Sequence, residues 1–372
     1  MTSGIASILD KKELEKSDIL ELLRCDDEDA TLLCRTAASI RNKYVGNIVY
    51  LRGLIEFSNI CGKNCLYCGI RRDNRQIERY TITNNEVIEA AMKAFRLNFG
   101  SIAIQSGENS SEEFTSNVEY LVRTITEMTN GKLGITLSLG EQDKDTYRRW
   151  YEAGAHRYLL RIESSSSDLY RRIHPDDDMH RYERRIECLK NLQETGYQTG
   201  TGVMIGLPSQ TLSNLAEDIL FMRDFDIDMC GMGPFIEHTD TPLGKNGTDN
   251  PFLRERFNLT LRMIAIIRLV MKDINIVAST AMQSIDKLGR EMAIGSGANV
   301  VMPNLTPSRY RDGYRIYTGK PGYRDIDESN ISGLRLELLP GTKVGMGTFG
   351  DTPHYAKRIA GKGVSKESRY VR

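Results

Sequence analysis

The sequence has no net charge and no long apolar run. Its fifty Lys and Arg residues balance fifty Asp and Glu residues, so no overall field favours nucleic acid or an anionic membrane surface. No apolar stretch approaches the roughly 20 residues that a membrane-spanning helix requires. The N-terminal residues MTSGIASILDKKELEKSD also lack the apolar core of a secretory signal. We therefore expect a soluble, cytoplasmic protein.

The cysteines do not form the pattern of a disulfide framework. Seven cysteines are an odd number, and a large chain without an export signal is kept where thiols stay reduced. The five histidines show no paired spacing that would indicate a histidine metal site. Four cysteines are scattered and are interpreted as ordinary thiols, because free cysteine behaves as a small apolar residue: Cys25, Cys34, Cys188 and Cys230.

Short β-rich runs alternate with segments of helical periodicity along most of the chain. The first 45 residues are charged and have the spacing of two helices with a break at residues 26–28. Most of the runs that follow are separated by a helix-capable segment, which is the pattern of βα units. The predicted strands are 50–57, 101–107, 134–140, 157–163, 199–206, 229–236, 275–282 and 299–304.

This alternation predicts an α/β protein with a (β/α)8 barrel of the TIM type. An open, doubly wound sheet is the alternative architecture. We favour the barrel because the strand count reaches eight and because polar residues recur where strands end, which is where barrels place their sites. The expected domains are an N-terminal helical extension at 1–45, the barrel at 46–318 and a C-terminal extension packed on the barrel at 319–372.

Three cysteines are clustered in CGKNCLYC, directly behind the first predicted strand: Cys61, Cys65 and Cys68. Structural zinc normally takes four protein ligands, and no Cys or His follows within 80 residues. A group of buried core thiols is disfavoured because the intervening Gly, Lys and Asn are loop formers. A 4Fe-4S cluster takes one thiolate per iron, so three cysteines leave one iron able to bind a bidentate small molecule.

The spacing C-x3-C-x2-C, with Tyr67 before the last cysteine and Gly69 after it, resembles the signature of the radical S-adenosylmethionine (SAM) superfamily. The resemblance implies an enzyme in which the three cysteines bind one 4Fe-4S cluster. It also implies that the amino and carboxylate groups of SAM chelate the fourth iron. One electron then cleaves the sulfonium C–S bond and releases a 5′-deoxyadenosyl radical.

Polar groups at later strand ends fit such a site, although each has a simpler interpretation. QSGE at 105–108 resembles the element that holds the methionine amino group, but Glu108 could merely favour the start of a helix. Strand four ends in RIE, where Arg161 and Glu163 would face the same side of the sheet. Glu163 is a candidate partner of the ribose or sulfonium and Arg161 a candidate clamp for a substrate anion, unless the two form an ion pair at the rim.

Two further segments are assigned to the cofactor. Arg185 is similar in placement to an arginine that binds the carboxylate of SAM in relatives, with a solvated helix charge as the alternative. GTGVMIGLPSQT has too many glycines for an ordinary strand, which suggests close approach of a ligand to the backbone. We expect the adenine to stack there.

Longer stretches resemble the HydE family of FeFe-hydrogenase maturases over about residues 38–318, including loops such as TGVMIGLPSQT and GPFIEHTDTPL. This resemblance implies one group of residues that bind the cluster-bound cofactor: Gln105, Glu163, Arg185, Tyr314, Tyr67 and Ser138. It implies a second, catalytic group that lines the substrate cavity: Arg161, Thr136, Ser279, Thr280, Met302 and Tyr317. On a helix, Tyr314 and Tyr317 would share one face.

The resemblance also implies a substrate and partners. The substrate would be an iron complex of cysteine with carbonyl and cyanide ligands, made by the maturase HydG. The 5′-deoxyadenosyl radical would attack it at sulfur, and the product would be a precursor of the di-iron subcluster that the maturase HydF carries. Such a substrate is anionic, which gives Arg161 a physical reason to lie beside it. A separate electron donor is also implied.

Two features depart from the family pattern. Some relatives hold a second cluster on cysteines of the C-terminal tail, but no cysteine follows Cys230, so we predict a single cluster. Ser279 stands where threonine is familiar, which keeps the hydroxyl. The alternatives are a radical mutase like methylornithine synthase, which would need anionic partners for the ammonium group of its substrate, and a non-catalytic iron–sulfur carrier. Formation of 5′-deoxyadenosine would exclude the carrier.

Overall fold

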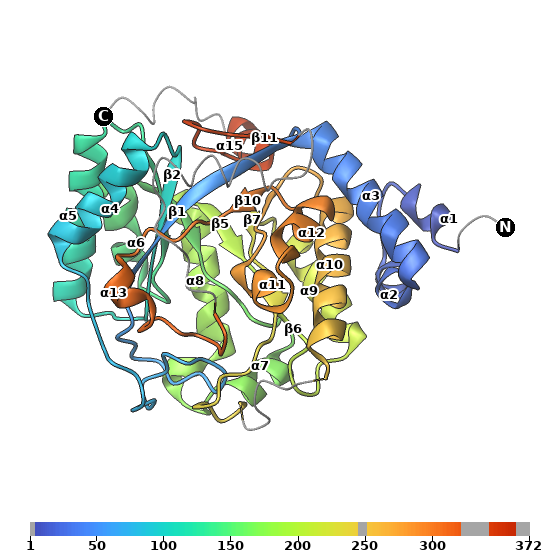
Figure 1. Ribbon diagram of the computed structural model, residues 1–372, viewed down its shortest axis with the longest axis horizontal. Coiled ribbons are helices and arrows are strands. Elements are labelled where there is room, and N and C mark those ends of the chain that lie inside the picture. The colour runs from blue at the N-terminus through green and yellow to red at the C-terminus, as the bar shows by residue number, and fades with distance from the viewer. Residues whose placement is uncertain (1–3, 245–250, 321–341, 362–372) are drawn as a thin grey trace.

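The computed structural model describes residues 4–244, 251–320 and 342–361 (Figure 1). Three helices precede the first strand: α1 (Ala6–Leu9), α2 (Lys16–Arg24) and α3 (Asp27–Tyr44). The predicted break between two helices is present but lies slightly earlier, at residues 25–26 instead of 26–28. Asp26 caps α3 by accepting a hydrogen bond from the backbone N–H of Asp29 at 2.9 Å. Arg41 of α3 donates to the carbonyl of Ile294 at 2.8 Å and so attaches this extension to the barrel.

Eight parallel strands curl into the predicted barrel, so the α/β barrel class is confirmed. The strands follow one another around the sheet nearly in chain order, as successive βα units require. In sheet order they are β10 (Val300–Val301), β1 (Ile48–Ser58), β2 (Ser101–Ser106), β3 (Gly134–Ser138), β4 (Ala155–Leu159), β5 (Gln198–Thr201), β7 (Met229–Cys230) and β9 (Asn275–Ile276).

The last joint of the barrel lies between β9 and β10. It consists of one parallel bridge, Val277 to Val300, with hydrogen bonds from Asn299 N to Ile276 O and from Ala278 N to Val300 O, both 2.9 Å long. Beyond the main sheet, β6 (Met204–Ile205) and β8 (Gly233–Pro234) pair with each other and extend the wall at the carboxyl end of the strands.

Helices cover the outside of the sheet (Figure 1). The longer ones are α4 (Asn84–Arg96), α5 (Glu112–Met128), α6 (Lys144–Ala153), α8 (Tyr182–Thr195), α9 (Leu212–Asp224) and α10 (Leu253–Val270), together with the short α12 (Gly289–Gly295). Several of them begin at a residue whose side chain caps the helix, as α4 does at Thr83, which forms a capping box with Glu86. Each also buries one apolar stripe, as α5 does with Val118, Leu121 and Ile125.

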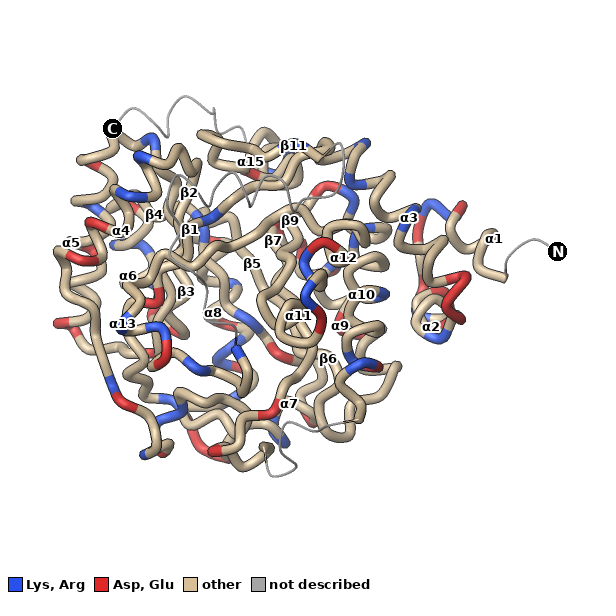
Figure 2. The backbone as a smooth tube through the Cα atoms, viewed as in Figure 1, with Lys and Arg blue, Asp and Glu red and all other residues tan. Residues whose placement is uncertain are grey.

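The shorter helices lie in the loops that follow strands. They are α7 (Ser167–Ile173), the 3-10 turn Asp178–His180, α11 (Thr280–Ile285) and α13 (Ser308–Arg311). Basic and acidic residues are interspersed over the outer elements (Figure 2), in keeping with the balanced composition. Among the described residues, none of the helices combines the length and the apolar character needed to cross a bilayer.

The C-terminal residues close the amino end of the barrel. β11 (Lys343–Val344) pairs with β1, and α15 (Pro353–Gly361) follows. Residues 349–352, here called the floor segment, lie between β11 and α15. Burial opposes ionisation of Asp351 in this segment, but the neighbouring Arg157 lowers its pKa below the usual value. Residues 321–341 and 362–372 of the predicted C-terminal extension lie outside the described residues, and the predicted domain limits stay a prediction.

Strand starts hold the floor segment through polar side chains. Arg157 of β4 contacts Asp351 at 2.7 Å, and Gln198 of β5 donates to the same carboxylate at 2.6 Å. Asn275 of β9 donates to the carbonyl of Gly350 at 2.7 Å. These bonds satisfy polar groups that would otherwise be buried without partners inside the barrel.

A histidine connects α15 to the loops that follow α9 and α10, and its titration predicts a pH dependence. The ring of His354 contacts Asp273 at 3.0 Å and Asp226 at 2.8 Å. The hydrogen bond to Asp273, with that to Asp226, raises the pKa of His354 above its usual value. A pKa raised by folding stabilises the folded chain fully below the unfolded pKa, and this contribution is lost as the pH rises through the folded pKa.

We therefore expect the amides of α15 to lose protection from hydrogen exchange, after correction for intrinsic rates, as the pH rises from about 6 to about 8.5. His354→Gln should lower the protection at low pH and flatten the slope. Lys357→Gln is the matched control, because Lys357 also contacts Asp273, at 2.7 Å, but is not a histidine. A slope that persists in His354→Gln would contradict the assignment.

Candidate active site

A cavity of about 330 Å³ lies at the carboxyl ends of the barrel strands. Every side chain predicted from the sequence to bind metal, cofactor or substrate lines it. The predicted cluster ligands and cofactor-binding residues there are Cys61, Cys65, Cys68, Tyr67, Gln105, Ser138, Glu163, Arg185 and Tyr314. The predicted substrate-binding residues there are Thr136, Arg161, Ser279, Thr280, Met302 and Tyr317. The structure thus brings these residues together, and their individual roles stay predictions.

The cysteine loop follows β1 and is shaped by polar side chains. Arg79 donates from one nitrogen to the carbonyls of Asn59 at 2.6 Å and Ile70 at 2.8 Å. The Asn59 amide in turn donates to the carbonyl of Gly313 at 2.7 Å. A Cβ atom on Gly107 would lie 2.3 Å from the carbonyl oxygen of Ile60, so only glycine lets β2 end so close to the loop.

The three buried thiols are suited to bind the positively charged iron atoms of a cluster. Burial raises the pKa of Cys65 to about 12 and also raises the pKa of Cys61 and Cys68. Such thiols give up their protons when a cation binds, because the cation replaces the water that would have stabilised the thiolate.

A single metal ion is a poorer match for these residues. In the described ranges, no three His, Cys, Asp or Glu side chains gather in the way that one metal ion requires. A cluster takes each thiolate on a different iron, so its ligands stand around a larger body. The donor set, three thiols on one cavity wall, therefore fits the predicted cluster.

Unpaired polar atoms in the cavity wall also indicate a polar ligand. The hydroxyl oxygens of Thr136 and Ser279 are buried and have no hydrogen-bond partner among the described residues. Buried hydroxyls are normally bonded, and leaving one without a partner costs free energy. Both residues were predicted to line the substrate cavity, and both are available to a bound ligand.

Arg161 and Glu163 lie beyond the end of the observed strand, although the predicted strand at 157–163 included them. β4 ends at Leu159, so these two side chains do not share a face by strand alternation. Glu163 instead takes a left-handed backbone, with φ of 64°, which is uncommon for a residue other than glycine. Its N–H donates to Gly202 O at 3.0 Å, and Met204 N donates to its carbonyl at 3.1 Å. Backbone strain of this kind is typical of functional sites.

The ion pair considered from the sequence is present, but it lies in the cavity wall. Arg161 Nη2 is 2.9 Å from Glu163 Oε2, and both atoms are buried without a regular hydrogen bond to the described residues. Burial raises the pKa of Glu163, and the positive charge of Arg161 opposes this effect. The pair therefore keeps two charges in a mostly enclosed site, where a ligand can bind either.

The tail residues of the site do not lie on a helix. α13 ends at Arg311, and Tyr314 and Tyr317 follow in an irregular segment, so the helical face suggested for them is wrong. Thr280 likewise begins α11, which shortens the predicted seventh strand to Asn275–Ile276. In both places tertiary packing decides the backbone, because the short apolar runs fit more than one local structure.

Sequence reasoning gave no site role to four charged residues that line the cavity: Arg52, Glu56, Lys63 and Lys320. It placed a fifth, Glu108, only within the QSGE element. Glu56 is buried, and its carboxylate contacts Lys320 and accepts from Asn304 at 3.0 Å. A signal for two of them was present, because Arg52 and Glu56 are charged residues four apart in an apolar strand and therefore point to one face. Nothing in the sequence marked Lys320.

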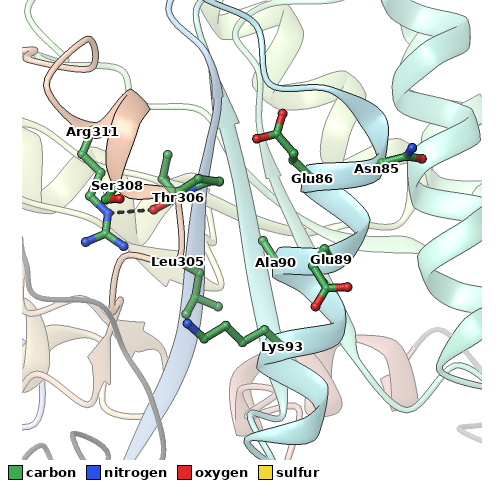
Figure 3. A pocket seen from close by; sticks show the side chains of 10 residues that line it. Asn85, Glu86, Glu89, Ala90, Lys93, Leu305, Thr306, Ser308 and Arg311 are labelled. Carbon is green, nitrogen blue, oxygen red and sulfur yellow. Dashed lines mark hydrogen bonds between the residues drawn. The ribbon is translucent and has the colours of Figure 1, made fainter.

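A second hollow lies on the outside of the barrel, between α4 and the chain around α13 (Figure 3). Its charged side chains include Glu86, Glu89, Lys93 and Arg311. None of the residues predicted for metal, cofactor or substrate lines it. The cavity at the carboxyl ends of the strands is therefore the candidate active site.

Comparison with known proteins gives a consistent result. The model of the radical SAM superfamily matches residues 55–222. The chain is 44% identical over 313 residues to the [FeFe] hydrogenase maturase subunit HydE of Thermotoga maritima, covering 84% of this chain and 86% of that protein. It is 27% identical over 343 residues to 3-methylornithine synthase of Methanosarcina acetivorans, covering 90% of this chain and 93% of that protein.

Solved structures show the same fold. The crystal structure of methylornithine synthase has a TM-score of 0.77 at 22% identity, with coverage of 96% of this chain and 99% of that one. The FeFe-hydrogenase maturase HydG from Carboxydothermus hydrogenoformans has a TM-score of 0.74 at 18% identity, with coverage of 91% and 79%. At these identities the likeness concerns the fold alone.

Proposed function

The chain belongs to the radical SAM superfamily and to its HydE family, and from this premise we propose that it is a maturase of FeFe-hydrogenase that prepares the di-iron subcluster. It is a radical SAM enzyme whose cofactors are a 4Fe-4S cluster and SAM. One observation carries the proposal: the three thiols and the predicted substrate-binding side chains line the same cavity.

We assign one group of cavity residues to the cofactors and another group to the substrate. Cys61, Cys65 and Cys68 would hold the cluster, and Arg185 and Glu163 would hold SAM. When both are bound, the cluster and SAM would supply the 5′-deoxyadenosyl radical. The apolar walls, which include Phe235 and Ile236, exclude water from the reacting atoms.

We place a cysteine-bound iron complex with carbonyl and cyanide ligands in the remaining part of the cavity. Arg161 binds its anionic groups, and the hydroxyls of Thr136 and Ser279 donate to its polar ligands. In this pose the sulfur of the complex is presented to the adenosyl group. HydG would supply the complex and HydF would accept the product, as the family membership supports.

The cavity favours an anionic substrate over the amine of a mutase like methylornithine synthase. An ammonium group needs a carboxylate partner, and three carboxylates line the cavity. However, Glu56 is bonded to Lys320 and Asn304, and Glu163 is paired with Arg161. Glu108 lies 3.3 Å from Lys63 and accepts a hydrogen bond from Glu141 N at 2.8 Å. An amine would therefore have to displace a cation that is already in place. An anion can instead accept from Arg161 Nε and from the hydroxyls of Thr136 and Ser279, which have no hydrogen-bond partner among the described residues.

Two assays on the anaerobically reconstituted protein test the proposal in turn. With SAM and a reductant, we expect 5′-deoxyadenosine. With HydG and HydF added, we expect apo-hydrogenase to become active, and omission of this protein to leave it inactive. No 5′-deoxyadenosine would leave only an iron–sulfur carrier. Formation of 5′-deoxyadenosine without maturation would overturn the substrate assignment.

A further inference from the structure

Glu141 is a fully buried carboxylate directly behind the wall of the active site. It follows β3 and Gly140, and its side chain has no exposed surface. It does not line the cavity, although Gly140 does. Since an ionised carboxylate is costly to bury without cations beside it, this position requires strong partners.

Three cations surround this carboxylate. Its Oε1 accepts from Arg185 Nε at 2.6 Å, and its Oε2 accepts from Lys63 Nζ at 2.8 Å. Arg184, which is half exposed, approaches Oε2 at 3.1 Å. The turn at Gly140 makes this possible: its φ is 80°, and a Cβ atom there would lie 2.4 Å from Glu108 Oε2. One carboxylate thus bridges two buried cations from different parts of the site.

The first cation belongs to the cysteine loop. Lys63 lies between Cys61 and Cys65, and its Nζ also donates to the carbonyl of Met179 and lies 3.3 Å from Glu108 Oε1. Glu108 N in turn lies 3.3 Å from Cys61 Sγ and donates to it. Hydrogen bonds and charges next to the cluster sulfurs set the reduction potential of a cluster. Glu141 therefore lies in the electrostatic surroundings of the cluster.

The second cation faces the cofactor. Arg185 donates from Nε to Glu141 and from Nη1 to the carbonyl of Arg161. These two bonds fix the plane of the guanidinium, and among the described residues Nη2 has no acceptor. Because Arg185 lines the cavity, the remaining N–H groups point where a ligand carboxylate can accept them.

We propose that Glu141 is a positioning residue that links the reduction potential of the cluster to the affinity for SAM, because it holds Lys63 and Arg185 on the two oxygens of one carboxylate. The inference rests on the cluster-binding and SAM-binding part of the proposed function, and it is independent of the substrate.

Charge predicts the sign of each effect. Without the negative charge of Glu141, the cations beside the cluster are in excess, and they favour the more negative, reduced cluster. Glu141→Gln should therefore raise the midpoint potential. Lys63→Gln removes a positive charge next to the same loop and should lower it. A purely structural role would not give opposite signs.

A shorter side chain at position 141 separates the effect on the reduction potential from the effect on the affinity for SAM. Glu141→Asp keeps the charge but is one methylene too short to reach Lys63 and Arg185 together. We expect its midpoint potential to stay near that of the wild type while its affinity for SAM falls by about 10- to 100-fold, as for other residues that orient a ligand of the metal centre. Glu141→Gln should lose affinity to a similar extent.

The test uses the full chain, reconstituted without oxygen, in a redox titration of the cluster followed by electron paramagnetic resonance and in calorimetric titration with SAM. Asp228→Asn is the matched control, because Asp228 is also a fully buried carboxylate that binds an arginine, Arg358, and a backbone N–H, Thr199 N at 2.9 Å. It lies at the opposite end of the barrel and should lose thermal stability alone.

The outcomes are distinct. Opposite shifts in Glu141→Gln and Lys63→Gln, with lost SAM affinity in Glu141→Asp, support the proposal. If Glu141→Gln does not fold, the other two variants decide. If the variants lose only stability, as Asp228→Asn does, the proposal is overturned. If the wild-type chain itself forms no cluster or binds no SAM, the proposed function fails instead.

Discussion

Cys68→Ser is expected to abolish the cleavage of SAM. Cys68 is one of three thiols that we propose as ligands of three different irons, and among the described residues no fourth cysteine and no histidine lines the cavity to replace it. A serine hydroxyl in this buried loop does not ionise readily and is a hard ligand, whereas cluster iron prefers thiolate. We therefore expect the reconstituted variant to lose most of its iron and to form 5′-deoxyadenosine only at background level.

Cys230→Ser is the matched control for this result. Cys230 lies in β7, is fully buried, and burial raises its pKa to about 12, as for Cys65. Its sulfur contacts Met222 and does not line the cavity. We expect the Cys230→Ser variant to bind iron and to cleave SAM as the wild type does. Iron analysis, absorption spectra and chromatography of 5′-deoxyadenosine measure both variants, and an active, iron-loaded Cys68→Ser would refute the ligand assignment.

We expect Arg161→Ala to retain the cleavage of SAM but to lose hydrogenase maturation. Arg161 pairs with Glu163 at 2.9 Å and extends into the part of the cavity that we assign to the substrate. Loss of a charged partner from an enclosed site costs about 2 kcal/mol or more, which corresponds to a decrease of about 30-fold or more. We expect that decrease in the rate of maturation, measured with HydG and HydF, while 5′-deoxyadenosine without substrate stays near the wild-type rate.

Arg161→Lys tests whether the charge suffices. Lysine keeps the positive charge but presents a single ammonium group in place of a planar fork, so it should recover only part of the maturation rate. Arg185 donates to the backbone carbonyl of residue 161, which every substitution at this position retains. We therefore expect the position of Arg185, and with it the binding of SAM, to be kept in both variants. Maturation at the wild-type rate in Arg161→Ala would remove the role proposed for this side chain.

The barrel could be predicted because its signal is distributed over the whole chain. Each strand run precedes or follows a segment of helical periodicity, and an error in one element would leave the alternation of the others intact. The lengths of the individual strands were less predictable. Strands at 157–163 and 275–282 end early, at Leu159 and Ile276, because a loop or helix that builds the site begins inside the apolar run.

The site was predicted where a residue type and a motif coincide. Cys61, Cys65 and Cys68 stand in a spacing that few other chemistries need, and Arg161 and Glu163 are charges at the end of an apolar run. The buried network of Lys63, Glu108 and Glu141 was missed. In sequence these are unremarkable polar residues in three separate loops, and only the closure of the barrel brings their side chains within bonding distance.

The floor segment has a consequence for the order of events in the cell. Residues 349–352 bond to strand starts that were made up to about two hundred residues earlier, at Arg157, Gln198 and Asn275. Until residues 349–352 have been synthesised, the polar groups of these three strand starts lack these partners at the amino end of the barrel. We therefore expect the amino end of the barrel to close only after the floor segment has left the ribosome.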